Sequence, residues 1–303
     1  MSSKTILSLD GGGSHVLIQL SVLACLEEDT GTPTYDLFDM IAGSSSGGLI
    51  TCLILGRCMS ASQIIHLMIN EKLLEKIMNA HWTDFFLNPL QIRPKYQGKS
   101  KSLAFSKMLG NLRLSSLKKR LFVPCFNLNH DELEIFTNEY ESDFLLSQIA
   151  DACTAAPSYY PPVLMEDGHW RIDGGVGMNN PALSAYLHAR QFWDEYEIKI
   201  LSIGSGWRSF EVKGSEACAY GGLQWSAKGI ASIILREKML ANVRMTEEIL
   251  GNRVLYINQY LKAYGLPDHM DSINTPIFQQ KAQEIGRLWY EHHREQIQDW
   301  MDR

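Results

Sequence analysis

The sequence is poor in the features that mark secreted scaffolds and membrane-spanning chains. Its six cysteines are scattered over 303 residues and no two form a C-x-x-C pair, whereas a disulfide scaffold is shorter and denser in cysteine. We therefore expect reduced thiols, buried like small hydrophobic side chains. No stretch approaches the roughly 18 uncharged apolar residues of a spanning helix, and the N-terminus lacks a signal-peptide core. These absences predict a soluble, cytoplasmic chain.

Acidic residues are missing from the window between Asp84 and Asp131. The window holds nine of the 28 basic residues, so the rest of the chain carries 19 basic against 34 acidic ones. The nine bases are Arg93, Lys95, Lys99, Lys101, Lys107, Arg113, Lys118, Lys119 and Arg120. A basic block on an acidic body indicates a face attracted to phosphates, and a solvated surface of scattered charge is the alternative. We expect residues 85–130 to form a basic, helical, cap-like segment.

Short β-type runs that end in glycine turns alternate with helical runs. The predicted strands are Thr5–Leu9, Phe38–Ala42, Phe122–Leu128, Leu133–Thr137, Trp170–Ile172 and Ile198–Ile203. The predicted helices are Val16–Glu28, Gly47–Leu55, a helix from the capping box of Ser60 and Gln63 to about Ala80, Leu145–Cys153 and Pro181–Trp193, with 223–303 mostly helical. This order is typical of a layered α/β domain with a mostly parallel sheet. Sites in such sheets lie beyond the carboxyl ends of the strands.

The motif Gly43-Ser44-Ser45-Ser46-Gly47 stands between a predicted strand and a predicted helix. A serine on so sharp a turn has a strained backbone, and small residues two positions away on either side avoid clashes. The helix that follows directs its N-terminal amides at the serine oxygen, where negative charge develops. This is the pattern of a nucleophile elbow with Ser45 as the nucleophile. The alternative is a turn of small residues that lets a helix pack closely on a strand.

A second glycine motif, Asp10-Gly11-Gly12-Gly13, also joins a predicted strand to a predicted helix. Successive glycines at a helix start expose backbone N–H groups and form a nest for anions. On the residues alone, the loop could cradle a nucleotide phosphate, form an oxyanion hole for acyl transfer, or be a tight turn. The nucleotide option is weak, because the loop matches neither a phosphate-binding loop nor a dinucleotide fingerprint.

The third motif, Asp173-Gly174-Gly175, follows a short predicted strand and precedes Asn179-Asn180-Pro181. An acid before two glycines is often only a turn former. Here it also supplies a carboxylate at a strand end, far along the chain from Ser45.

Together these motifs resemble the patatin-like phospholipase family, in its bacterial single-domain type, from Thr5 to about Asp271. The oxyanion loop of the family resembles Asp10–Gly13, its elbow Gly43–Gly47 and its aspartate motif Asp173–Gly175. Further parts of the family pattern are matched by Ala152–Pro157, Tyr159–Pro162 and Asn179–Pro181. The resemblance implies one catalytic domain over residues 1–303, a three-layer α/β/α fold with a mostly parallel central sheet.

The resemblance also implies a Ser–Asp dyad that needs neither cofactor nor metal. Asp173 would take the hydroxyl proton of Ser45 as Ser45 attacks an ester carbonyl, and the amides of Gly11, Gly12 and Gly13 would hold the oxyanion. Asp173 would then return the proton to the leaving alcohol and activate water. The implied substrates are phospholipids and their lyso forms, met at the membrane surface. A general lipid or carboxyl esterase is the alternative.

A histidine-containing triad is the competing arrangement, with His188, His269, His292 or His293 as its base. It is disfavoured because the elbow follows only two predicted strands and the glycine loop precedes the first helix. The chain also departs from the family pattern after the glycine loop. A basic residue and a glycine normally follow there, whereas this chain has His15 and Val16.

Two further hypotheses concern partners. Compact bacterial members of the family include antiphage effectors switched on by cyclic nucleotides, so the basic window could bind a nucleotide activator. Alternatively, the chain is a non-catalytic binding protein on this fold. The basic window, Trp207 and the segment Leu223–Ile234 with Trp225 are candidates for peripheral contact with the inner membrane, and burial in the core is the alternative for Trp207 and this segment. We expect no nucleic-acid polymer as partner, and the sequence leaves the oligomeric state open.

Overall fold

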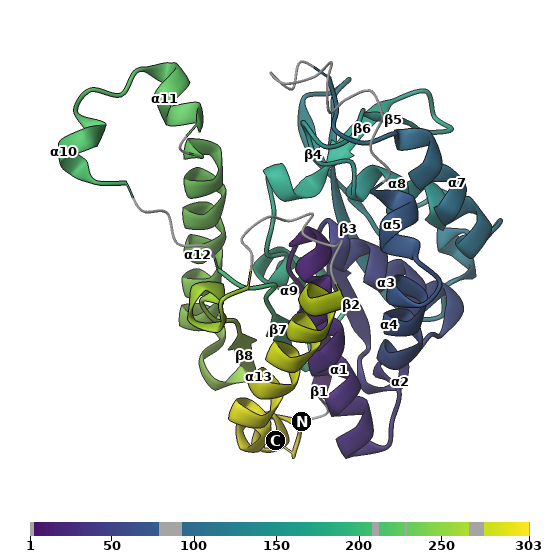
Figure 1. Ribbon diagram of the computed structural model, residues 1–303. Coiled ribbons are helices and arrows are strands. Elements are labelled where there is room, and N and C mark those ends of the chain that lie inside the picture. The colour runs from purple at the N-terminus through teal and green to yellow at the C-terminus, as the bar shows by residue number, and fades with distance from the viewer. Residues whose placement is uncertain (1–2, 79–92, 208–211, 228, 267–275, 303) are drawn as a thin grey trace.

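The computed structural model describes residues 3–78, 93–207, 212–227, 229–266 and 276–302. An eight-stranded sheet forms its centre, in the order β5-β6-β3-β2-β1-β7-β8 with β4 paired to β3 (Figure 1). The strands are β1 (Ser3–Leu9), β2 (Met40–Gly43), β3 (Arg120–Asn127), β4 (Glu132–Phe136), β5 (Val163–Leu164), β6 (Trp170–Asp173), β7 (Glu197–Ile203) and β8 (Val254–Ile257). The main helices are α1 (Val16–Thr30), α3 (Ser46–Arg57), α4 (Ala61–Ile69), α7 (Gly98–Leu109), α8 (Leu146–Cys153), α9 (Ala182–Ala189), α12 (Ile230–Leu250) and α13 (Pro276–Asp302). Shorter ones are α2 (Thr34–Leu37), α5 (Leu73–Ile77), α10 (Gly214–Ala217) and α11 (Gly222–Ala227).

The central strands are parallel, as predicted. β1 pairs with β2 and β7, β2 pairs with β3, and β7 pairs with β8, all in parallel. In this register Leu9 stands opposite both Gly43 and Ile203. The turns that follow β1, β2 and β7 therefore lie side by side at one edge of the sheet. At the β3 end of the sheet, β4, β5 and β6 pair in antiparallel fashion.

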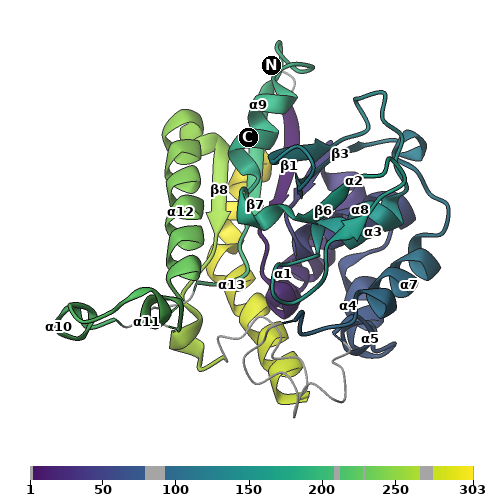
Figure 2. The same cartoon turned by 90° about the horizontal axis from the view of Figure 1, so that it is seen from above.

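Alternating side chains of the strands build a separate core on each face of the sheet. In β1, Leu7 and Leu9 join one cluster with α1, α3, α8 and α13, whereas Ile6 joins the other with α9. This period of two is what a sheet covered on both faces requires. Figure 2 shows the result at β8, where α12 lies on one side of the strand and α13 on the other. The three-layer α/β/α expectation is confirmed.

The capping box at Ser60 and Gln63 is present, but the helix it starts is shorter than predicted. Ser60 accepts from the Gln63 amide while the Gln63 side chain accepts from the Ser60 amide. The helix ends at Ile69, and α5 begins only after Lys72, whose φ of 58° lies in the left-handed region. A residue in that conformation cannot continue a right-handed helix. The prediction of one helix as far as Ala80 was therefore wrong, and residues 79–80 lie outside the described residues.

Two segment predictions need correction. The range 85–130 contains α7 but also β3, an interior strand of the sheet, so its described part is not a helical cap; residues 85–92 lie outside the described residues. The range 223–303 is mostly helical, yet it also supplies β8. That strand was missed because a run of four residues between helices carries little periodicity.

The basic window does not form one cationic face, because at least four of its nine bases bind acidic side chains or carbonyls of this chain. These are the pairs Lys101–Asp151, Arg113–Glu166 and Arg120–Glu139 and the bonds from Lys119 to the carbonyls of Tyr35 and Phe38. The remaining five bases are exposed: Arg93, Lys95, Lys99, Lys107 and Lys118.

The six cysteines are free thiols, but they are not uniformly buried. Cys58 and Cys218 are exposed, so the expectation of buried thiols was wrong for these two. Among the described residues, no single helix is long and apolar enough to span a bilayer, although the bent pair α3 and α4, at 118° to each other, passes by length and composition.

Candidate active site

Ser45 lies at the sharp turn between β2 and α3, with φ 52° and ψ −123°. A non-glycine residue rarely adopts a positive φ, and such strain collects at functional sites. The neighbouring glycines make this turn possible by sterics. A Cβ on Gly43 would stand 2.2 Å from the Gly47 carbonyl oxygen, and a Cβ on Gly47 would stand 2.5 Å from the carbonyl oxygen of Leu9. The motif therefore has the local geometry expected of a nucleophile elbow.

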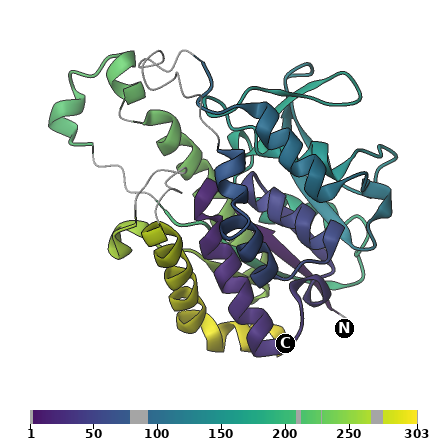
Figure 3. The same ribbon diagram turned by 45° about the vertical axis from the view of Figure 1, so that its right-hand side comes forward.

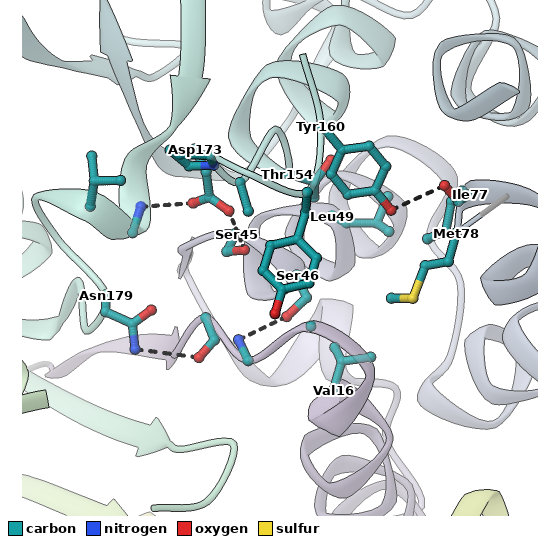
Figure 4. Close-up of a pocket in the computed structure, with 18 of the residues that line it drawn as sticks. Val16, Ser45, Ser46, Leu49, Ile77, Met78, Thr154, Tyr160, Asp173 and Asn179 are labelled. Atoms are coloured by element: carbon teal, nitrogen blue, oxygen red, sulfur yellow. Dashed lines mark hydrogen bonds between the residues drawn. The ribbon is translucent and has the colours of Figure 1, made fainter. Parts of the chain in front are cut away.

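The Ser45 hydroxyl meets the Asp173 carboxylate (Figure 4). Ser45 Oγ donates to Asp173 Oδ2 at 2.5 Å, and the Gly175 amide donates to Asp173 Oδ1 at 2.7 Å. Asp173 is the last residue of β6, and its own amide donates to the Ala155 carbonyl at 3.1 Å. The structure thus brings together two side chains that the sequence places in separate motifs.

Burial makes Asp173 a stronger base than an ordinary aspartate. Desolvation raises its pKa from 3.8 to about 6, against the lowering effects of the hydrogen bonds from Ser45 and Gly175 and of the charge on Lys101. At neutral pH the carboxylate is still ionised, and its proton affinity lies closer to the working pH, which suits a general base.

The glycine loop packs directly against Ser45, but its three amides are not equivalent. A Cβ on Gly11 would stand 2.9 Å from Ser45 Cβ. The Gly11 amide donates to the Asn179 carbonyl at 3.1 Å, so it would have to leave this bond to hold an oxyanion, and that role stays a prediction. The Gly12 amide donates to Ser46 Oγ at 3.1 Å, a side chain that can rotate away. Within the described part of the chain, no hydrogen bond is made by the Gly13 amide.

Asp10, the first residue of this loop, is held in place by hydrogen bonds to its carboxylate. Its carboxylate accepts from Asn180 Nδ2 at 2.7 Å and from the Tyr256 hydroxyl at 2.9 Å. Complete burial raises the pKa of Asp10 to about 7 despite these bonds. The sequence had singled out Asn180, whereas Tyr256 lies in β8 and had no local signal.

A cavity of about 450 Å³ opens in front of Ser45 and Asp173. Apolar side chains form most of its wall, among them Val16, Leu49, Met68, Leu74, Ile77 and Leu235. Tyr160 closes one side by donating its hydroxyl to the Ile77 carbonyl at 3.0 Å (Figure 4). The contributions of α5 and α12 were missed, because nothing local in their sequences indicates a shared cavity. A chamber of this size and character suits an alkyl chain.

Among the residues that the structure describes, no histidine lines this cavity. His188 lies on α9 among the rings of Phe122, Tyr140 and Phe192. His292 and His293 lie on α13, and His269 falls outside the described residues. The geometry therefore favours the pair Ser45–Asp173 over a histidine triad.

His15, the departure from the family pattern, is buried under the glycine loop. Its Nδ1 lies 3.2 Å from the Gly12 carbonyl oxygen, and its ring meets the Phe278 ring edge-on at 5.6 Å. Among the described residues, no group of three or more His, Cys, Asp or Glu side chains is arranged to hold a metal ion.

Comparisons with known proteins find similarity to one family. A family model described as patatin-like phospholipase matches residues 7–186. Patatin-like protein 2 of Oryza sativa subsp. indica is 27% identical over 291 residues, covering 82% of this chain and 72% of the rice protein. Patatin-like protein 2 of Arabidopsis thaliana is 30% identical, covering 73% and 65%. The crystal structure of VipD from Legionella pneumophila has a similar fold, with a TM-score of 0.52 at 16% identity over 96% of this chain and 66% of VipD.

Proposed function

This chain belongs to the patatin-like phospholipase family, and from that premise we propose that it hydrolyses lipid esters through Ser45 and Asp173. The observation that carries the proposal is the 2.5 Å hydrogen bond from Ser45 Oγ to Asp173 Oδ2 at the head of an apolar cavity. A nucleophile in hydrogen-bond contact with a buried base is the minimum requirement for acyl transfer.

In the proposed mechanism Asp173 takes the hydroxyl proton as Ser45 Oγ attacks the ester carbonyl. The amides of Gly12 and Gly13 hold the negative charge of the tetrahedral intermediate, and Ser46 Oγ leaves the Gly12 amide when the substrate enters. Asp173 then gives the proton to the leaving alcohol. In the second half it takes a proton from the water that attacks the acyl-enzyme, and it returns this proton to Ser45 Oγ as the bond between Ser45 Oγ and the acyl carbon breaks and the fatty acid leaves.

We propose phospholipids and lysophospholipids as the substrates, with one acyl chain in the apolar cavity. The apolar cavity is the observation that supports a substrate with an alkyl chain on the acyl side of the ester. The same cavity is equally compatible with other lipid or carboxyl esters. Activation by a cyclic nucleotide, a role in antiviral defence, a bacterial single-domain type and a cytoplasmic location at the inner membrane stay predictions.

The contact with the membrane surface that we propose involves α11 and the start of α12. These helices rise with α10 away from the sheet (Figures 1 and 3). Leu223 and Ile234 are 87% and 60% exposed, and the stretch 217–236 contains no acid. Ala231, Ser232 and Leu235 of α12 also line the cavity, so a lipid adsorbed here is next to the proposed site. Trp207, by contrast, packs against Tyr260.

The proposal is tested by labelling with a fluorophosphonate probe, followed by peptide mass spectrometry. We expect a single adduct on Ser45, together with fatty acid release from lysophosphatidylcholine. Ser45→Ala should abolish both. Ser44→Ala is the matched control, because the neighbouring Ser44 hydroxyl is buried and makes no hydrogen bond to the described residues. Equal labelling of the Ser45→Ala protein at another serine would remove Ser45 from the mechanism.

A further inference from the structure

A buried cation, Lys101, lies in the wall of the cavity, most of which is apolar. It extends from α7, its side chain is 1% exposed, and its Nζ lies 3.1 Å from Asp151 Oδ1. The ammonium also lies 4.4 Å from the centre of the Tyr160 ring. Burying an ion pair costs several kcal/mol per ion unless its geometry compensates, so an aliphatic side chain would line an alkyl pocket more simply. Lys101 therefore calls for an explanation other than lipid contact.

The hydrogen bonds of Lys101 are made at the C-terminus of α8. Nζ donates to the Asp151 carbonyl at 2.6 Å and to Thr154 Oγ1 at 3.2 Å. Thr154 is the C-cap residue that follows this helix. The last carbonyls of a helix have no partner within the helix and carry partial negative charge, so a cation there satisfies and stabilises them. Lys101 thus fixes the position of the helix end.

The end of α8 contacts both members of the proposed dyad. Cys153 Sγ lies 3.6 Å from the Ser45 carbonyl oxygen and 3.5 Å from the Ala150 carbonyl oxygen, within hydrogen-bond distance of both. The Ala155 carbonyl, two residues further on, accepts the amide of Asp173 at 3.1 Å. A shift of the helix end would therefore move Ser45 and Asp173 relative to each other.

We propose that Lys101 is a positioning residue for the dyad, which closes the C-terminus of α8 and thereby fixes Ser45 Oγ against the Asp173 carboxylate. This inference rests on the proposed function of the dyad. It goes beyond it, because Lys101 belongs to none of the motifs that suggested the site.

The charge of Lys101 has a second, separable effect. The charge of Lys101 from α7 acts on Asp173, and the Asp173 carboxylate in turn acts on the thiols of Cys125 in β3 and Cys153 in α8. Burial raises the pKa of both thiols well above 9.0, so they are neutral at working pH. The ammonium favours the ionised form of Asp173, although burial also lowers the pKa of Lys101 itself and Asp151 opposes that lowering. Removing the cation should therefore raise the pH at which Asp173 loses its proton.

Three variants separate these effects, with a short-chain water-soluble p-nitrophenyl ester as substrate. Lys101→Gln keeps a donor for the helix end and removes the charge. Lys101→Met removes both, and Lys101→Met combined with Asp151→Asn avoids leaving a buried carboxylate unpaired. The control is Lys107→Gln, an exposed lysine on the same helix. For each variant we would measure kcat and KM against pH, the rate of fluorophosphonate labelling of Ser45, and thermal unfolding.

We expect the Met variants to lose roughly tenfold or more in kcat and labelling rate, since misplacement by about 1 Å can cost on the order of 10²-fold, while KM changes little. All three variants should shift the acid limb of the pH profile upward, and Lys101→Gln should keep more of kcat. A folded double variant with the kcat and pH profile of the wild type would overturn the proposal. If the Met variants do not fold, a Lys101→Gln protein whose kcat, labelling rate and pH profile all match those of the wild type overturns it. Wild-type protein without any esterase activity would instead refute the proposed function.

Discussion

Replacing Asp173 by Asn separates two effects of the carboxylate: its role as the base in catalysis, and the lowering of the free energy of unfolding that results from burying its charge. Burial raises the pKa of Asp173 from 3.8 to about 6, and this shift of about two units corresponds to roughly 3 kcal/mol at about 1.36 kcal/mol per unit. Below about pH 4 the carboxyl is protonated in the folded and the unfolded chain, and it costs little. As the pH rises from about 4 to 6, the carboxyl ionises in the unfolded chain before it ionises in the folded one. The free energy of unfolding therefore falls over this range, by up to the roughly 3 kcal/mol that corresponds to the pKa shift. Above pH 6 the full cost is present.

Asparagine can keep both hydrogen bonds of Asp173, because its oxygen accepts from Gly175 and its amide donates to Ser45 Oγ. Urea unfolding of the Asp173→Asn protein should therefore match the wild type near pH 4 and exceed it by up to about 3 kcal/mol at pH 8. Asp10, whose pKa burial raises to about 7, is present in both proteins and cancels in the difference.

The same substitution should lower ester hydrolysis by about 10²–10⁴-fold, because Asn cannot accept the serine proton. In the wild type, kcat/KM should fall about tenfold per pH unit below the Asp173 pKa near 6. If the Asp173→Asn protein and the wild type differ in stability by the same amount at pH 4 and pH 8, burial of the Asp173 carboxylate does not destabilise the fold as argued. Hydrolysis close to the wild-type rate would refute Asp173 as the base.

Two other predictions follow from contacts around the site. Gly47→Ala places a Cβ 2.5 Å from the Leu9 carbonyl oxygen. The substitution should therefore lower the free energy of unfolding by about 1–3 kcal/mol and abolish labelling of Ser45. An unchanged melting temperature would contradict the tight turn. Leu223→Ser combined with Ile234→Ser should weaken binding to phosphatidylcholine vesicles by about tenfold or more, while hydrolysis of a water-soluble ester is unchanged. Ile277→Ser on α13, 74% exposed in the wild type, is the matched control, and vesicle binding that is lost only with added salt would favour the exposed bases instead.

The position of the candidate site could be predicted from the sequence because each glycine motif follows a strand. Leu9 stands opposite Gly43 in the parallel register, so the turns after β1 and β2 had to meet. The rule that sites lie beyond the carboxyl ends of parallel strands also predicted that Asp173 is near Ser45. The position is right but the reason is not, because β6 is antiparallel to β3. Phe122 pairs with Ala42, and Cys125, three residues further along β3, pairs with Asp173. Asp173 therefore ends level with Ser45, which is three residues beyond Ala42.

The parts that could not be predicted depend on contacts between distant segments. The Gly11 amide donates a hydrogen bond to the Asn179 carbonyl, and this bond joins two of the recognised motifs. Lys101 was counted as one of nine surface charges, and the sequence contains no sign that it is buried against Asp151. Charge patterns report composition, whereas the fate of each base depends on which helix packs over it.

A dyad also has to replace the third residue that orients the base in a triad. Here the backbone can do so. The Gly175 amide holds Asp173 Oδ1, so that Oδ2 is presented to Ser45, and the Ala155 carbonyl holds the Asp173 amide. Because backbone groups move only with their elements, the alignment of the pair depends on how α8, β6 and α3 pack. Substitutions that never touch the substrate, such as those at Lys101, should therefore alter kcat more than KM.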